Sequence, residues 1–228
     1  MDIKPRNSIS NQVYEYLKNQ ILKDELHPGQ HLAQERVAEE LNVSRMPVRE
    51  ALRLLEQDGL VERLPQGGLR ITPVTLETIR HVLGTRAALE VYAIELACDR
   101  ISEKEIAKLE NIKYQADELL NQTSLGQSEK TKRFFDLNTE FHETIYEITG
   151  NPYLIKFILQ LRNLVLRMRA IGLREATVWI QIWEEHGQIL DSLKRKDKEA
   201  ARRCIKQHIE NAASYTTAVV RMEKFNSY

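Results

Sequence analysis

The segment from Leu41 to Leu60, LNVSRMPVREALRLLEQDGL, constrains the fold of this chain more than any other stretch. Ser44 stands where a helix N-cap belongs, and its hydroxyl can accept a free amide of the next turn. Pro47 falls in that first turn, where its missing N–H does no harm, and Asp58-Gly59 ends the helix. An apolar stripe recurs at helical spacing and consists of Val48, Ala51, Leu52 and Leu55. Arginines lie off that stripe at Arg45, Arg49 and Arg53. The segment therefore predicts a helix with an apolar back and a basic front, a shape that the major groove of DNA accepts.

The flanking residues predict the rest of a winged helix-turn-helix. A short helix over 33–41 and a turn at Asn42-Val43 precede the arginine-bearing helix, and Asn tolerates the left-handed backbone of a tight turn. Two strands, 60–64 and 69–72, enclose a turn at 65–68 that contains Gly67. A first helix upstream is marked by Val13, Leu17, Ile21 and Leu22. The alternative is a small packed helical unit with surface arginines, but four elements in this order favour DNA binding.

Composition limits the classes of protein to which the chain can belong. With 228 residues it has room for two modest domains, and 29% charged residues beside 42% hydrophobic ones are typical of a globular chain. The formal net charge is zero, so DNA affinity has to come from locally placed arginines and should have a moderate salt dependence. Two cysteines make no disulfide framework, no stretch approaches a membrane span, and the N-terminus has no apolar signal core. We expect a cytoplasmic protein that contacts no membrane.

The strand signals end near Pro73, and helical periodicity runs from there to the C-terminus. Six helices fit, at 76–101, 103–122, 128–149, 152–171, 175–195 and 197–224. Ser102 and Asp197 are suited to be N-caps, while Gly126 and the segment 150–152 break helices. The expected fold is therefore mainly α, with a winged helix-turn-helix domain over 1–74 and an all-helical bundle over 75–228.

Three histidines lie on apolar faces of three different predicted helices: His142, His186 and His208. A single inward histidine is more often a hydrogen-bonded core residue than a ligand. Three in one bundle bury several polar nitrogens, and one divalent metal would satisfy all of them. Asn138, one turn before His142, can add an oxygen ligand. Zinc is the first choice because imidazole suits it, with nickel and manganese as alternatives.

Arg86 and Glu90 share the inward face of the helix predicted over 76–101. One interpretation is a weak salt bridge within that helix. The other is that Arg86 reaches into a cavity and holds the carboxylate of a ligand, which a guanidinium fits as a two-pronged donor. Trp179 and Trp183 could form a wall of that cavity, although we favour a core role for at least one of them.

At this point the chain resembles a known family, the GntR family of bacterial transcriptional regulators with a FadR-type C-terminal domain, called FCD. The resemblance is carried by VSRMPVREALRLLEQDGLV, by PQGG in the wing and by LHPGQHL before the second helix. In the helical part it is carried by Arg86 with Leu89-Glu90, NTEFH at 138–142, GNPYL, EH at 185–186 and His208.

The resemblance implies a homodimer that reads a short inverted repeat of double-stranded DNA. It also implies that the helical domain binds a small metabolite, often a carboxylate, beside a metal. By motif match, the DNA contacts would be Ser44, Arg45, Arg49 and the wing tip at Gly67. The metal positions would be Asn138, His142, His186 and His208.

The chain departs from the family pattern at two positions. Many metal-binding members have Asp where this chain has Asn138, a neutral and poorer ligand. Some members have an Arg near the start of the second helix where this chain has Glu35, and a carboxylate there would repel phosphate instead of making a DNA contact.

The leading functional hypothesis is a non-enzymatic regulator, a repressor whose DNA affinity responds to a small carboxylate. One rival is a metal-dependent enzyme with a DNA-binding appendage, which would need a general base beside the metal-bound water. Glu185 adjoins His186, but neighbouring helical residues point about 100° apart. The other rival is a purely structural metal, although such zinc sites are usually closed and rich in cysteine.

Overall fold

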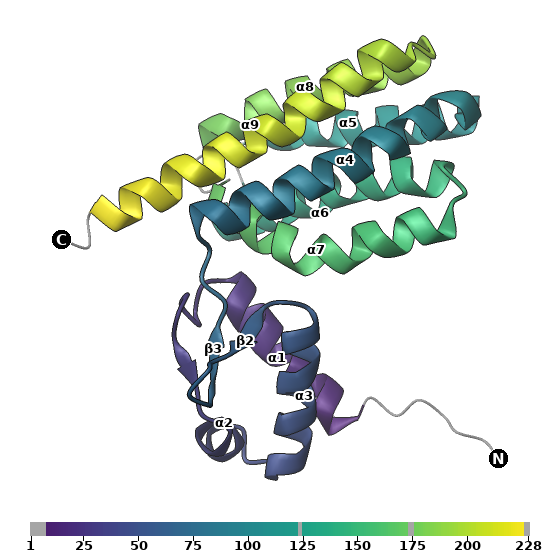
Figure 1. The fold of residues 1–228 in the computed structure, drawn as a ribbon. Helices are drawn as coiled ribbons and strands as arrows, with labels where there is room; N and C mark the ends of the chain where they lie inside the picture. Colours follow the sequence, from purple (N-terminus) through teal and green to yellow (C-terminus); the bar gives the residue numbers. More distant parts are fainter. Residues whose placement is uncertain (1–7, 123–124, 173–175, 226–228) are drawn as a thin grey trace.

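A computed structural model describes residues 8–122, 125–172 and 176–225 of the chain. Within these ranges the chain forms nine helices and three short strands (Figure 1). The N-terminal unit contains α1 (Ile9–Leu22), β1 (His31–Leu32), α2 (Gln34–Glu40), α3 (Arg45–Gln57), β2 (Val61–Arg63) and β3 (Leu69–Ile71). The helical bundle contains α4 (Leu76–Arg100), α5 (Glu103–Asn121), α6 (Gln127–Ile148), α7 (Pro152–Gly172), α8 (Ala176–Lys194) and α9 (Lys198–Phe225). The predicted mainly helical fold with a small wing is confirmed.

The wing is an antiparallel sheet of strand order β1-β3-β2. Val61 pairs with Ile71 and Arg63 with Leu69, as expected of the predicted hairpin. Gly67 and Gly68, at the turn, have φ of +90° and +89°, which is the backbone region that favours glycine. The third strand, β1, was not predicted, because two residues carry no alternation that a sequence pattern could reveal.

The stripe on α3 forms the centre of the N-terminal core. All four of its apolar residues are buried, and they pack with Val13, Leu17 and Ile21 of α1. Asn42 has a φ of +51°, the left-handed turn that was expected. The expected hydroxyl cap is wrong: Ser44 is the N-cap residue by its backbone, but its side chain makes no capping hydrogen bond. Ser44 is exposed, so water can satisfy the first amides of α3.

The bundle helices begin and end close to the predicted positions. Ser102 and Glu105 form a capping box at α5, and Asp197 Oδ1 accepts a 3.0 Å hydrogen bond from the Ala200 amide at α9. The predicted start of one helix at residue 175 lies outside the described residues. No helix within the described ranges combines the length and apolarity needed to cross a bilayer.

The bundle core is built around aromatic rings. Trp179 stacks on Phe134 with ring centroids 4.4 Å apart, and Trp183 meets Phe134 edge-on at 6.4 Å. Both tryptophans are buried in the main hydrophobic cluster, and neither lines the cavities described below. Both are therefore core residues, and they hold α8 in the position from which His186 reaches the bundle interior.

Candidate functional site

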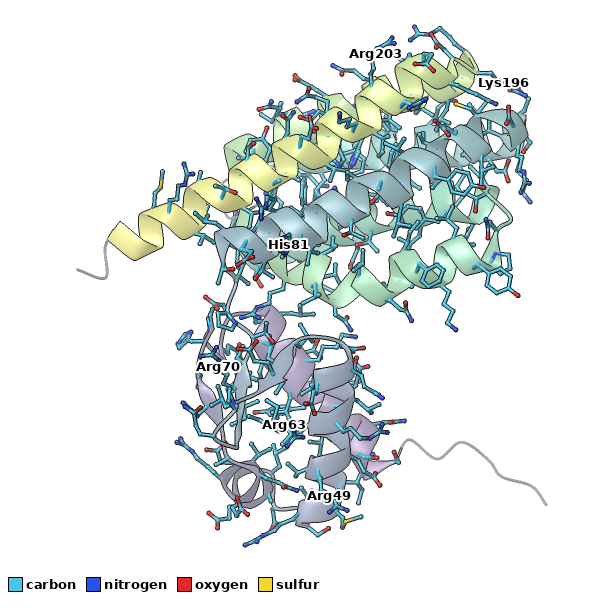
Figure 2. All side chains as sticks on the ribbon, in the orientation of Figure 1. Arg49, Arg63, Arg70, His81, Lys196 and Arg203 are labelled. Atoms are coloured by element: carbon cyan, nitrogen blue, oxygen red, sulfur yellow. The ribbon has the colours of Figure 1, made fainter. Side chains whose placement is uncertain are left out.

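The arginines of α3 lie on the surface of the N-terminal unit. Arg45 and Arg49 are exposed, and Figure 2 shows Arg49 at the end of the molecule away from the bundle. Within the described residues, Arg49 Nη2 contacts the sulfur of Met46 at 3.0 Å rather than a carboxylate. Arg63 and Arg70 near the wing are instead paired with Glu56 and Glu62. Arg49 therefore offers its charge directly to an incoming phosphate or base.

Glu35 pairs with Arg45, one of the predicted DNA contacts, at 3.3 Å. Both side chains are more than half exposed, so the pair contributes little to stability. A phosphate that binds Arg45 has to displace this carboxylate. The repulsion that the sequence suggested at Glu35 is therefore a competition between the Glu35 carboxylate and a DNA phosphate for the guanidinium of Arg45.

The three predicted histidines converge in the bundle interior from α6, α8 and α9. His142 Nε2 lies 3.4 Å from His186 Nε2 and 3.3 Å from His208 Nε2. All three side chains are buried, and their ligand atoms lie within 4.8 Å of one another. A tetrahedral zinc with Zn–N bonds of about 2.0–2.1 Å places its ligand nitrogens about 3.3–3.4 Å apart. The spacing of the nitrogens therefore fits a small divalent cation at their centre.

Two carboxylates orient two of these rings. His142 Nδ1 lies 2.9 Å from Glu90 Oε2, and His208 Nδ1 lies 2.7 Å from Glu185 Oε2. Each carboxylate favours the tautomer with the proton on Nδ1, which makes Nε2 the acceptor nitrogen on the side of the other histidines. Arg86 Nη2 also lies 3.4 Å from His142 Nε2. Burial lowers the pKa of His208, and the charge of Arg86 adds to that effect. A neutral imidazole is the form that binds metal.

Asn138 lies one turn from His142 on α6 and is buried. Its Oδ1 has no hydrogen-bond partner among the described residues, and it lines a small cavity together with His208. A buried amide oxygen without a partner is destabilising, so this atom is suited to a cation or a ligand donor. The chemistry of the donor set, three imidazoles and one amide oxygen, fits a metal.

Arg86 has an ion-pair partner on its own helix. Its Nε donates to Glu90 Oε1 on the same helix, and both side chains are at least 96% buried. Burial by itself would raise the pKa of Glu90, but the charge of Arg86 and the hydrogen bonds from His142 and Tyr146 hold this pKa well below its usual range. The pair that was the simpler interpretation of the sequence is thus present, in a buried network rather than as a weak surface bridge.

Two small cavities meet at Arg86. The first is enclosed by α4, α6 and α7 and is lined by Arg86, His142, Tyr146, Arg162 and Val165, among others. The second lies between Arg86, Asn138 and His208, and Val165 lines it as well. The volumes are about 40 Å³ and 20 Å³. Both cavities therefore adjoin the histidine cluster and share one guanidinium.

The sequence did not indicate that Glu90, Glu185 and Tyr146 support the site. Tyr146 donates a 2.6 Å hydrogen bond to Glu90 Oε1, which joins α6 to the ion pair on α4. Glu90 carried a usable signal, since a carboxylate on an apolar helix face needs a partner. Glu185 carried none, because it neighbours His186 in sequence but contacts His208 on another helix.

Glu185→Gln is expected to weaken zinc binding about 10- to 100-fold, the usual loss when a partner of a metal-binding histidine is removed. The amide cannot hold the His208 tautomer as a carboxylate does. Competition with a zinc chelator of known affinity measures the loss. Glu184→Gln is the matched control, because Glu184 precedes it on α8 and is exposed. Equal zinc affinities of the two variants would contradict the orienting role of Glu185.

The chain is similar to known proteins over most of its length. Residues 9–71 match the family described as "Bacterial regulatory proteins, gntR family", and residues 81–211 match the FCD domain, more than half of the chain. The chain is 29% identical over 215 residues to the uncharacterized HTH-type transcriptional regulator YdhC of Bacillus subtilis, covering 94% of both chains. It is 26% identical over 209 residues to the transcriptional repressor RspR of Escherichia coli, covering 91% of this chain and 89% of the repressor. The structure of E. coli McbR/YncC shares the fold, with a TM-score of 0.69 at 24% identity over 92% of this chain and 97% of that one.

Proposed function

This chain belongs to the GntR family of bacterial transcriptional regulators, in the group that carries an FCD domain, and from that membership we propose its function. It is a metal-containing repressor, and binding of a small carboxylate changes its affinity for DNA. The N-terminal unit, with boundaries at 1–74, reads DNA. The bundle, over 75–228, binds the metal and the ligand. The protein works in the cytoplasm, where its DNA lies, and it is a regulator rather than an enzyme.

For DNA recognition we assign base and phosphate contacts to Ser44, Arg45, Arg49 and Gly67. Their exposure on α3 and at the wing tip supports this assignment. The protein acts as a homodimer, since one neutral chain with a few exposed arginines offers too little contact for a specific site. Exposed aromatic side chains on α4 and α7 support a second copy, and they include Tyr92, Tyr153 and Phe157.

For the metal we assign zinc, held by His142, His186, His208 and Asn138. The distances of His142 Nε2 from His186 Nε2 and His208 Nε2, 3.4 Å and 3.3 Å, support zinc over larger cations. Asn138 is a neutral ligand, so it does not neutralise any of the positive charge of the cation, as an aspartate would. Zinc supplies a Lewis-acidic centre to which a carboxylate oxygen can bind.

The charge of the buried site supports a monocarboxylate as the ligand. A divalent cation and Arg86 bring three positive charges, and Glu90 and Glu185 bring two negative ones. With neutral histidines, one positive charge remains uncompensated in a buried space. A single carboxylate neutralises it, which burial strongly favours. The single observation that carries the proposal is that Arg86 lines two cavities, one together with His142 and the other together with Asn138 and His208.

A screen of monocarboxylic and dicarboxylic acids by thermal shift, on the zinc-loaded protein, tests the ligand. An acid at 100 times its Kd is expected to raise Tm by about 5–10 °C, from about 2.7 kcal/mol of linkage and roughly 2–4 °C per kcal/mol. Arg86→Ala should lose this shift. Because that variant leaves the Glu90 carboxylate buried without a cationic partner, a second variant, Arg86→Met with Glu90→Gln, removes both charges together.

The regulatory step is tested with a DNA site selected from random duplexes by the native protein. Each acid found in the screen is expected to change affinity for that site at least about fivefold, the lower end of usual coupling between two sites. If the acids stabilise the native protein and both Arg86 variants to the same extent, Arg86 does not hold the carboxylate. If an acid binds tightly but leaves DNA affinity unchanged, the bundle does not regulate DNA binding, and the metal site is purely structural.

A further inference from the structure

Helix α7 presents two faces with different neighbours. Arg162, Val165 and Leu166 line the cavity beside Arg86. Asn163, Leu164 and Arg167 contact the N-terminal unit instead. Adjacent residues of a helix point about 100° apart, so the two sets alternate on neighbouring faces of the same two turns. In Figure 1, α7 lies on the side of the bundle that faces α1 and α3.

The contact with the N-terminal unit centres on the end of α3. Asn163 Nδ2 donates a 2.6 Å hydrogen bond to Asp58 Oδ2, and the Tyr14 hydroxyl of α1 donates to the same oxygen. Leu164 packs against the N-terminal core, and its Cδ1 lies 3.3 Å from the position that a Cβ on Gly59 would occupy. Asp58 immediately follows the arginine-bearing helix, so this contact fixes where that helix points.

A second part of the contact is incompletely satisfied. Arg167 is 3% exposed, and its Nη1 donates to the carbonyl of Thr72. Its Nη2 and the Thr72 hydroxyl are both buried, and neither has a hydrogen-bond partner among the described residues. Buried polar atoms without partners weaken a contact. This part of the contact is therefore weaker than fully paired polar groups would make it.

The cavity beside Arg86 is too small for a metabolite. Its volume is about 40 Å³, whereas small-molecule sites measure about 300–1,000 Å³. A ligand has to part the walls. Two walls, α4 and α6, are joined by Glu90, which bonds to Arg86, His142 and Tyr146. The wall contributed by α7 consists of apolar side chains and Arg162, whose Glu143 partner is partly exposed. Of the three walls, α7 is the one that the hydrogen bonds of Glu90 do not hold.

We propose that α7 is the element that transmits ligand binding to the DNA-reading unit, through the contact of Asn163, Leu164 and Arg167 with Asp58, Gly59 and Thr72. This inference rests on the proposed function. A ligand that displaces α7 from α4 and α6 breaks or shifts this contact and so changes the placement of α3. Transmission from the ligand through α4 and the linker to the N-terminal unit is then secondary.

The first test asks whether the contact holds the N-terminal unit. Asn163→Ala is compared with Gln160→Ala, an exposed amide on the same helix, in the full-length zinc-loaded protein. Hydrogen exchange of peptides covering 54–60 is expected to be roughly 2- to 10-fold faster in Asn163→Ala, as one lost hydrogen bond implies. Peptides covering 34–43 serve as an internal reference. Equal exchange at 54–60 in the two variants would overturn the proposal.

The second test fills the cavity in place of a ligand. Thr139→Phe puts a larger side chain into the cavity from α6, and Leu159→Trp does so at its exposed mouth if the first variant does not fold. Either is expected to change affinity for the selected DNA site at least about fivefold. In the Asn163→Ala background the change in affinity should fall below about twofold, which is within the usual scatter of additive effects, because the signal passes through the contact that this variant weakens.

The same change in both backgrounds would show that the signal passes along α4, and the proposal would fail. No change in the native background, in a protein that still binds its site, would also overturn it. If the native protein selects no DNA sequence, the proposed function fails, while the exchange measurement still decides whether the contact on α7 exists.

Discussion

His186→Ala is expected to reduce the zinc content of the purified protein from one ion per chain to a trace. His186 is fully buried, and its Nε2 lies 3.4 Å from that of His142. Loss of a direct ligand should exceed the roughly 10- to 100-fold loss caused by removing an outer partner. Elemental analysis after equilibration against a zinc buffer measures the effect.

His81→Ala is the matched control, because His81 lies exposed on α4 (Figure 2). It removes one imidazole without touching the cluster. Absence of stoichiometric zinc in the native protein under replete conditions would leave the three histidines as core residues. The fourth ligand is decided by a second pair of variants. Asn138→Ala should lose zinc and Cys204→Ser should keep it, since burial raises the pKa of the Cys204 thiol. The reverse result would make Cys204 the ligand.

Arg49→Ala is expected to weaken binding to the selected DNA site by roughly 10-fold or more per subunit, because a bidentate arginine–base contact is worth about 1–3 kcal/mol. The chain has a net charge of zero, so the remaining surface offers no general attraction that would mask the loss. Fluorescence anisotropy at fixed salt gives the affinities. Half-sites should be separated by about one helical turn, ~34–36 Å, if a dimer binds.

Arg203→Ala removes the same charge at the far end of the bundle (Figure 2) and should leave DNA affinity unchanged. A circular dichroism melt checks that Arg49→Ala remains folded. Native affinity in Arg49→Ala would contradict the assignment of α3 as the recognition helix. A preference of the native protein for a single half-site would contradict the dimer.

Local patterns in the sequence were sufficient to predict most of the fold. The apolar stripe of α3, the turn at Asn42 and the glycines of the wing each record a constraint that acts within a few residues. The three histidines were predicted to point inward by the same reasoning, and the structure brings them together. The strand β1 escaped prediction because its partner, β3, lies about forty residues away in the chain, and only tertiary packing shows the pairing.

The surroundings of the histidines could not be predicted in this way. Glu90 meets His142 and Tyr146 only because α4 packs against α6, and Glu185 meets His208 only because α8 packs against α9. A helical wheel shows on which face of its helix a residue lies, but it does not show which residue of the adjacent helix that residue contacts. For Arg86 the helical wheel placed Glu90 beside it, but the burial of the pair and its bonds to α6 depend on the packing of α4 against α6. The role of Arg86 in binding a ligand stays a prediction.

Gly59 both ends helix α3 and makes room for helix α7. Its φ of +71° lets α3 end in a sharp turn, and its missing side chain leaves room for Leu164 of α7. Any other residue there would strain the backbone and press on Leu164 at once. A substitution at Gly59 therefore alters the end of α3 and its contact with α7 together. Arg45, Arg49 and Arg53 are exposed on α3, so each of them can change without disturbing this junction.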